Sequence, residues 1–183
     1  MARVPYLQKS DLAAADQDLL ARDITLHRAL AHSPKGARAF LGLGRLIRHE
    51  SRLDPRLREL AILQVGYLAR SPYEYSHHIK IGREFGVTDA DIRAMIEETE
   101  GRPTGLDAPA KLALKAAREM TSELAVSDAT FEALRRHFDP ERLVDLVMTI
   151  AFYCGVVRLL ASLQIDVEDD YRRYLEDYPL PRS

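Results

Sequence analysis

Glu74 and His78 are the two residues whose types and spacing best suit chemistry in this sequence. They are four positions apart, so on a helix they lie on one face. A carboxylate beside an imidazole raises its basicity and fixes its tautomer, which makes an acid–base pair that works near neutral pH. The alternatives are structural: Glu74 as the capping-box partner of Ser71, and His78 as a satisfied core histidine.

Glu59 is the third candidate, because it begins a stretch without any charge that runs from Leu60 to Ala69. The residues one turn further on, Ile62 and Leu63, are apolar, so we expect the carboxylate to point into the core. Desolvation raises the pKa of a carboxyl group, which would make Glu59 a proton donor or relay. The structural alternative is an ion pair with Arg158, a cation flanked by apolar residues.

Further side chains could bind a substrate, either through a guanidinium that grips a carboxylate or through a hydroxyl group. These candidates are Arg158, Tyr73, Tyr153 and Ser71. Arg45 and Arg48 could take the place of Arg158. His77 points about a quarter-turn away from His78 on a helix, and we expect it to be exposed.

The elements that must position these side chains are predicted to be helices almost throughout. No stretch alternates apolar and polar residues, and no Asn-Gly or Asp-Gly hairpin turn occurs. Apolar spacing and capping residues predict about eight helices, at residues 12–31, 37–49, 55–69, 71–86, 88–98, 108–124, 127–137 and 139–163. An acidic, aromatic segment follows at 167–178, and 101–105 is the expected long loop. The sequence therefore predicts an all-α fold in a single domain, 1–183.

The third and fourth of these helices carry the acid–base candidates. Asp54 is the expected N-cap of the third, with Pro55 at its first position, and Ser71-Pro72 opens the fourth. If the two helices form a hairpin that turns near Arg70, Glu59 lies opposite His78 or slightly beyond it.

Composition narrows the classes of function. The chain has 183 residues with 26 Lys and Arg against 28 Asp and Glu, a formal net charge of -2. Nothing in that balance favours nucleic acid or an anionic membrane as a partner. The single cysteine, Cys154, excludes an intrachain disulfide, a CxxC redox pair and a cysteine-rich zinc site.

Hydropathy bears on the location of the protein, and the spacing of possible ligands bears on metal binding. The N-terminus lacks the apolar core of a signal peptide, and the longest uncharged run, Leu146 to Val157, is too short to span a bilayer. We therefore expect a cytoplasmic protein with no membrane partner. Glu59, Glu74 and His78 could in principle supply three metal ligands, but we expect no metal and no cofactor.

The span Leu53 to Gly86, LDPRLRELAILQVGYLARSPYEYSHHIKIGREFG, resembles the signature of the carboxymuconolactone decarboxylase-like family, which includes the alkylhydroperoxidase D-type proteins. The family pattern has a glutamate here matched by Glu59, two catalytic positions matched by Ser71 and Glu74, and a histidine matched by His78. Ile150 to Arg158 resembles the family's second core helix, and the resemblance extends over about 40–163. It implies an orthogonal multi-helix bundle that assembles as a homo-oligomer: a dimer, trimer or hexamer.

One departure from the family pattern bears on activity. In the peroxidase branch the positions of Ser71 and Glu74 are both cysteines, and peroxide reduction requires a thiolate. CxxC-dependent peroxiredoxin activity is therefore not expected. The branch with glutamate at the second position implies a lyase-like, cofactor-free proton transfer (decarboxylation, isomerisation or lactone processing) on a small carboxylic acid or lactone.

The alternative is a non-catalytic binding or assembly module that keeps the peroxidase fold without thiol peroxidase activity. A buried Glu59–Arg158 pair with no cavity near His78 would favour the module. A partly apolar pocket with His78 at its wall would favour an enzyme.

Overall fold

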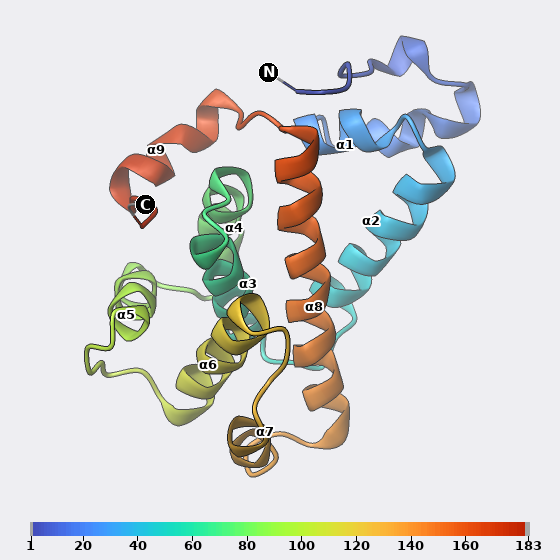
Figure 1. Ribbon diagram of the computed structural model, residues 1–183. Helices are drawn as coiled ribbons and strands as arrows, with labels where there is room; N and C mark the ends of the chain where they lie inside the picture. The colour runs from blue at the N-terminus through green and yellow to red at the C-terminus, as the bar shows by residue number, and fades with distance from the viewer. Residues whose placement is uncertain (1, 182–183) are drawn as a thin grey trace.

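The computed structural model describes residues 2–181 of the chain. The described residues form helices joined by short loops and no strand, which confirms the all-α prediction (Figure 1). The elements are two 3-10 helices and nine α-helices: η1 (Lys9–Asp11), η2 (Ala14–Leu20), α1 (Thr25–Leu30), α2 (Pro34–His49), α3 (Pro55–Leu68), α4 (Pro72–Glu84), α5 (Asp89–Thr99), α6 (Ala108–Ser122), α7 (Asp128–Leu134), α8 (Pro140–Leu163) and α9 (Asp169–Asp177).

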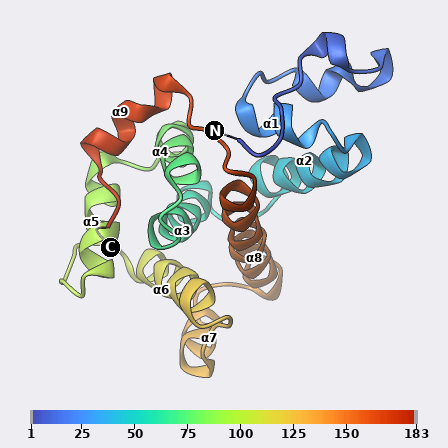
Figure 2. The ribbon, with the colours of Figure 1, turned by 45° about the horizontal axis from the view of Figure 1, so that its top comes forward.

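Helix α3 is the centre of the bundle. It packs against α4, α6 and α8, which surround it in both ribbon views (Figures 1 and 2). Every residue from Leu57 to Tyr67 is buried, as expected for a helix that is apolar on all sides. At its start the Asp54 carboxylate accepts a hydrogen bond from the Leu57 amide at 3.0 Å, which confirms the predicted N-cap.

Helices α3 and α4 form the hairpin that the sequence predicts. The turn passes through Arg70, whose φ of 49° lies in the left-handed region. Gly66 lets the two backbones approach closely, because a Cβ atom there would lie 3.2 Å from the Tyr75 amide nitrogen. Helix α4 ends at Glu84, and Gly86, with a φ of 92°, follows its C-cap residue Phe85 as the expected C-terminal glycine.

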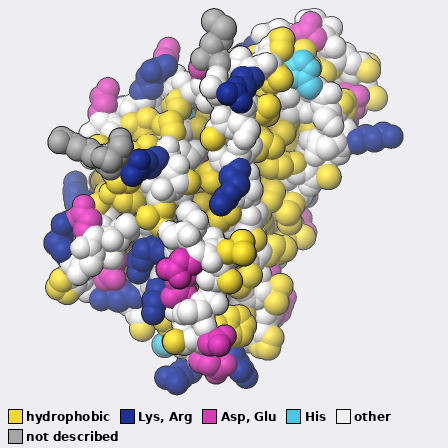
Figure 3. Space-filling view, viewed as in Figure 1, with side chains coloured by type: hydrophobic (Ala, Val, Ile, Leu, Met, Phe, Trp, Pro, Cys, Tyr) yellow, Lys and Arg dark blue, Asp and Glu magenta, His cyan; other side chains and the backbone are white. Residues whose placement is uncertain are grey.

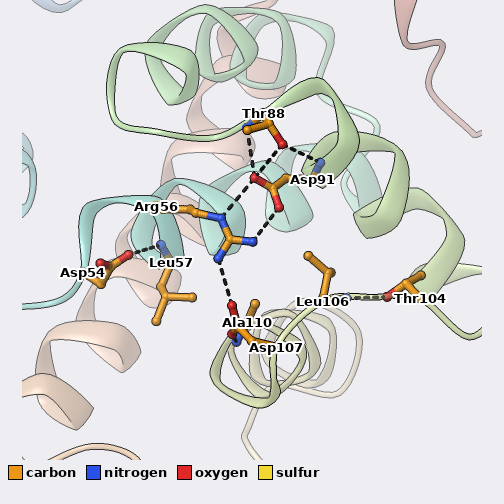
Figure 4. A network of polar contacts seen from close by, with 9 residues as sticks. All are labelled: Asp54, Arg56, Leu57, Thr88, Asp91, Thr104, Leu106, Asp107 and Ala110. Carbon is orange, nitrogen blue, oxygen red and sulfur yellow. Dashed lines mark hydrogen bonds and ion pairs between the residues drawn. The ribbon is translucent and has the colours of Figure 1, made fainter.

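A polar network joins the starts of α3, α5 and α6 (Figure 4). Arg56 donates from Nε to Asp91 at 3.0 Å and from Nη1 to Asp107 at 3.1 Å. Asp91 also accepts from the amide and the hydroxyl of Thr88, both at 2.9 Å, and so completes the capping box of α5. The side chain of Asp107 caps α6 through the Ala110 amide. This network ties the starts of the three helices to one another.

The N-terminal region differs from the prediction of one helix over 12–31. The chain forms η2, leaves helical geometry after Leu20 and resumes in α1. Arg38 of α2 explains part of this, since it donates to the Ala15 carbonyl and to the carboxylates of Asp16 and Asp18, holding η2 against α2. Helix α2 itself begins at Pro34 rather than at residue 37, because proline is well suited to the first turn of a helix.

Helix α8 is the longest element and runs beside α3 and α6. By length and composition it could cross a membrane, with a mean hydropathy of 2.0 in its most apolar window. That criterion is weak evidence, because the core helix of a soluble protein also meets it.

Candidate functional site

His78 lies between two carboxylates. Its Nδ1 atom donates a hydrogen bond to Glu59 Oε2 at 2.7 Å, across the α3–α4 hairpin. On the other side of the ring, Nε2 lies 3.0 Å from Glu74 Oε1, an ion-pair contact without hydrogen-bond alignment. All three side chains are buried. The structure therefore brings together the three residues that the sequence singled out.

The protonation states follow from this arrangement. Burial lowers the pKa of His78, but the charges of Glu74 and Glu59 outweigh it and raise the pKa to about 9. Burial also raises the pKa of Glu59, but the charges of His78 and then Arg58 lower it by more, so the pKa lies below its ordinary value. The expectation of a raised pKa that would make Glu59 a proton donor is thus wrong, and the alternative role as a proton relay stays a prediction. Glu59 is a carboxylate and His78 an imidazolium at neutral pH.

The cation that pairs with Glu59 is Arg58, not Arg158. Arg58 Nε donates to Glu59 Oε1 at 3.0 Å, and the Arg58 side chain is only 2% exposed. Arg158 is exposed on α8, where its guanidinium donates to the Cys154 carbonyl of its own helix. The structural alternative of a Glu59–Arg158 pair is therefore contradicted, and Arg158 does not reach the cluster.

A cavity of about 360 Å³ opens beside the cluster. Glu74, His78 and Tyr153 are at its wall, whereas Glu59 lies behind them and does not line it. Much of the remaining wall is apolar and comes from α1, α2, α4 and α8: Ile24, Leu26, Phe40, Leu41, Ile81, Phe152 and Val156. The Nε2 side of the imidazole thus faces the cavity and the Nδ1 side faces the core.

Three arginines, Arg22, Arg45 and Arg48, give the cavity a cationic part, next to the histidines His27 and His49. Arg45 pairs with Glu50 at 3.7 Å on the surface. Arg48 has no carboxylate within ion-pair distance in residues 2–181, and its Nε is buried without a hydrogen-bond partner. Burial, then Arg22 and Arg48, lower the pKa of His27 to about 4, so this imidazole is neutral. An anionic group of a ligand would supply the negative partner that the Arg48 guanidinium lacks.

The two tyrosines predicted to bind substrate both line the cavity. Tyr153 packs edge-on against the His78 ring, with centroids 5.0 Å apart. Burial, followed by Glu74 and Glu59, raises the pKa of its hydroxyl, which stays protonated. The Tyr73 hydroxyl accepts from the Leu26 amide at 3.3 Å and lies 3.4 Å from Glu168.

Ser71 is not at the cavity, where a substrate-binding hydroxyl was expected. It is the N-cap residue of α4, but its side chain forms no capping hydrogen bond and does not line the cavity. The expected capping box is absent because the Glu74 side chain turns to His78 instead.

His77 is buried, contrary to the expectation that it is exposed. Its ring is stacked between Tyr73 and Tyr171, with centroids 4.0 and 3.7 Å away. Nδ1 donates to the Tyr73 carbonyl at 2.9 Å, and Nε2 lies 3.1 Å from Glu168 Oε2. Tyr171 belongs to the aromatic C-terminal segment, so helix α9 covers the face of α4 that carries His77 (Figure 2).

The metal alternative finds no matching geometry. Glu59 and Glu74 contact opposite nitrogens of one ring, so the three side chains lie in a row rather than around a common point. Over the described chain, no group of three or more His, Cys, Asp or Glu residues is arranged to hold a metal ion.

Comparison with known proteins places the chain. Residues 34–119 match the model of the carboxymuconolactone decarboxylase family. A peroxidase-related protein of Ralstonia eutropha JMP134 with an alkylhydroperoxidase AhpD core is 20% identical, with a TM-score of 0.79 over 93% of this chain and 94% of that one. A peroxidase-related protein of Silicibacter sp. TM1040 is 19% identical (TM-score 0.70, 92% of each chain). The debrominase Bmp8 is 20% identical (TM-score 0.79, 96% of this chain and 97% of that one).

No curated protein sequence matches the chain. At these identities the solved structures establish the fold alone, and the residues that match the family model include Glu59, Glu74 and His78. Residues 34–119 of the 183 are thus similar to the carboxymuconolactone decarboxylase family, and the chain has the fold of the alkylhydroperoxidase D-like proteins.

Proposed function

We propose that the protein is a cofactor-free acid–base enzyme that acts on a small carboxylated substrate, in a decarboxylation, an isomerisation or lactone processing. The observation that carries the proposal is the cavity, which has His78 and Glu74 at its wall and an arginine without a carboxylate partner, Arg48, in the same lining. A shared fold does not specify a reaction, so the argument rests on these side chains.

His78 is the proton donor in this scheme, acting through Nε2. Its other nitrogen is held by Glu59, which stays ionised and fixes the ring. Glu74 faces the cavity beside Nε2 and can return a proton to the imidazole or take one from the substrate.

A decarboxylation and an isomerisation at this site differ in how the electron pair on the substrate carbon arises. In a decarboxylation the C–C bond to the departing carboxylate breaks, CO2 leaves, and the electron pair stays on the substrate carbon or its enolate. A proton from His78 then completes the product. In an isomerisation Glu74 removes the proton from one carbon and His78 supplies one to another. Arg48 holds a carboxylate that the substrate retains.

Thiol peroxidase chemistry is not part of the proposal. Ser71 and Glu74 stand where a dithiol would be, and neither can form a disulfide. Cys154 lies on α8 beside Thr121, at 3.6 Å from its hydroxyl, and does not line the cavity.

Solvent-proton exchange tests the proposal without knowledge of the natural substrate. A panel of small unsaturated and keto carboxylic acids and lactones is incubated with the protein in D2O, and NMR follows deuterium uptake and loss of carboxylate. We expect at least one compound to react, and His78→Ala and Glu74→Gln to abolish the reaction. Arg158→Ala is the matched control and should react as the unaltered protein does.

Two outcomes separate the alternatives. Full reactivity of His78→Ala refutes the acid–base role. Tight binding of a compound with no exchange or turnover, unchanged in His78→Ala, favours the non-catalytic module.

We further propose that the chain associates with copies of itself. Hydrophobic side chains gather in a band along α8 (Figure 3). Val144 on that helix is 64% exposed, and Leu46 on the neighbouring α2 is 38% exposed. Burial of such a face in a homo-oligomer would remove it from water. The cytoplasmic location remains a prediction.

A further inference from the structure

Arg58 is a buried cation that the acid–base scheme leaves without a role. Its side chain lies at the α3–α4 contact, with the guanidinium 4.5 Å from the centre of the Phe85 ring. It does not line the cavity, so it cannot touch a substrate there. In the described chain, Glu59 is the one carboxylate within ion-pair distance of it.

Glu59 is shared between two cations. One oxygen, Oε1, accepts from Arg58 at 3.0 Å, and the other, Oε2, accepts from His78 at 2.7 Å. Because both oxygens of Glu59 are occupied, the charge of Arg58 is coupled to the proton on His78 through a single carboxylate.

The charges of this cluster balance only when His78 is protonated. Two cations, Arg58 and His78, then face two carboxylates, Glu59 and Glu74, and the sum is zero. Loss of the proton leaves a net charge of minus one. Without Arg58 the same step would go from minus one to minus two, which is harder in a buried, weakly polar site.

The other groups that face His78 do not substitute for Arg58. Glu74 of α4 is an acid, and Tyr153 of α8 is a neutral phenol against the ring. Arg48 of α2 acts on Tyr153 from the cavity side, where a substrate anion would neutralise it. The permanent positive charge on the core side of His78 comes from Arg58.

We propose that Arg58 is a positioning residue that keeps Glu59 ionised and makes the proton of His78 easier to release. This proposal rests on the proposed acid–base function, because it gives Arg58 a role in the proton transfer at that site. Arg58 acts through Glu59 and never contacts the substrate.

The test is the protonation of His78, followed by the 15N shifts of its ring during a pH titration of the substrate-free protein. Arg58→Gln keeps a donor for Glu59 and removes the charge, so we expect it to raise the apparent pKa of His78 by about one unit. Arg58→Lys restores a charge and should bring the pKa most of the way back. Arg56→Gln is the matched control, since Arg56 pairs with Asp91 and Asp107 instead (Figure 4), and should leave the pKa unchanged.

An unchanged or lowered pKa in a folded Arg58→Gln protein overturns the proposal. If that variant does not fold, Arg58→Lys decides. A folded lysine variant whose His78 titrates like the unaltered protein supports a role of charge, and one whose His78 pKa rises by a unit or more overturns it. The titration needs no substrate, so its result is separate from the exchange experiment. A compound panel that fails to react would refute the proposed function while the role of Arg58 stood or fell on the titration.

Discussion

His78 should make the stability of the protein depend on pH in a defined window. The ordinary pKa of histidine is 6.5, and in the folded protein the value for His78 is about 9. Because the folded state holds the proton more tightly, the stabilisation is fully present below about 6.5 and is lost as the pH rises through 9. At roughly 1.4 kcal/mol per pKa unit, the difference corresponds to about 3 kcal/mol.

His78→Gln isolates this contribution. The glutamine amide can still donate to Glu59, which keeps its ion pair with Arg58, but it carries no charge. Urea unfolding of both proteins is measured from about pH 6 to about pH 10. The advantage of the unaltered protein in unfolding free energy should be largest at the acid end and smaller by about 3 kcal/mol at the alkaline end. Subtraction removes the other titrating groups that the two proteins share.

A difference that stays constant over this range would refute the assignment of His78 as an imidazolium. A difference that grows with pH would mean that folding favours the neutral ring, and it would remove the proton donor from the proposed reaction.

Three further predictions concern the scaffold and the assembly. Gly66→Ala should lower the unfolding free energy by about 1–3 kcal/mol in urea titrations, because the added methyl group meets the Tyr75 backbone at 3.2 Å. Asp91→Asn should lower the unfolding free energy obtained from thermal unfolding by about 1–3 kcal/mol, because it removes the charge that Arg56 faces at the junction of three helices. Val144→Lys should shift the mass measured by light scattering toward 20.7 kDa, the mass of one chain.

Each of these has a control or a contrary outcome. Gly42→Ala should be neutral or stabilising, since nothing lies within 4 Å of its added methyl group, and equal losses at Gly42 and Gly66 would contradict the close-approach argument. Asp89→Asn removes an exposed charge and should matter less than Asp91→Asn. If the unaltered protein already has the mass of one chain, self-association through α8 is wrong.

The α3–α4 hairpin was predictable because local signals agree with one another. Asp54-Pro55 and the charge-free stretch after Glu59 fix where α3 begins and what it buries. The short turn at Arg70 then requires an antiparallel partner, which places Glu59 near His78. Spacing along two helices and one turn was enough to predict that Glu59, Glu74 and His78 lie together.

The role of Arg58 was not predictable in the same way. Adjacent residues on a helix do not face each other, so spacing gives no reason to pair Arg58 with Glu59. Their pairing depends on the depth at which both are buried and on Phe85, which lies under the guanidinium. The burial of His77 likewise depends on α9, which is distant in sequence and reaches α4 only through tertiary packing.

The residues that line the cavity come from two parts of the chain, one inside and one outside the span that matches the family model. Glu74, His78 and the side formed by α2 come from residues 34–119, which match the family model. Other parts of the wall come from outside that span: Arg22 and His27 before it, and Tyr153 with its neighbours on α8 after it. Residues 34–119 therefore supply only part of the cavity lining, and a match over that span does not by itself determine the shape and charge of the cavity.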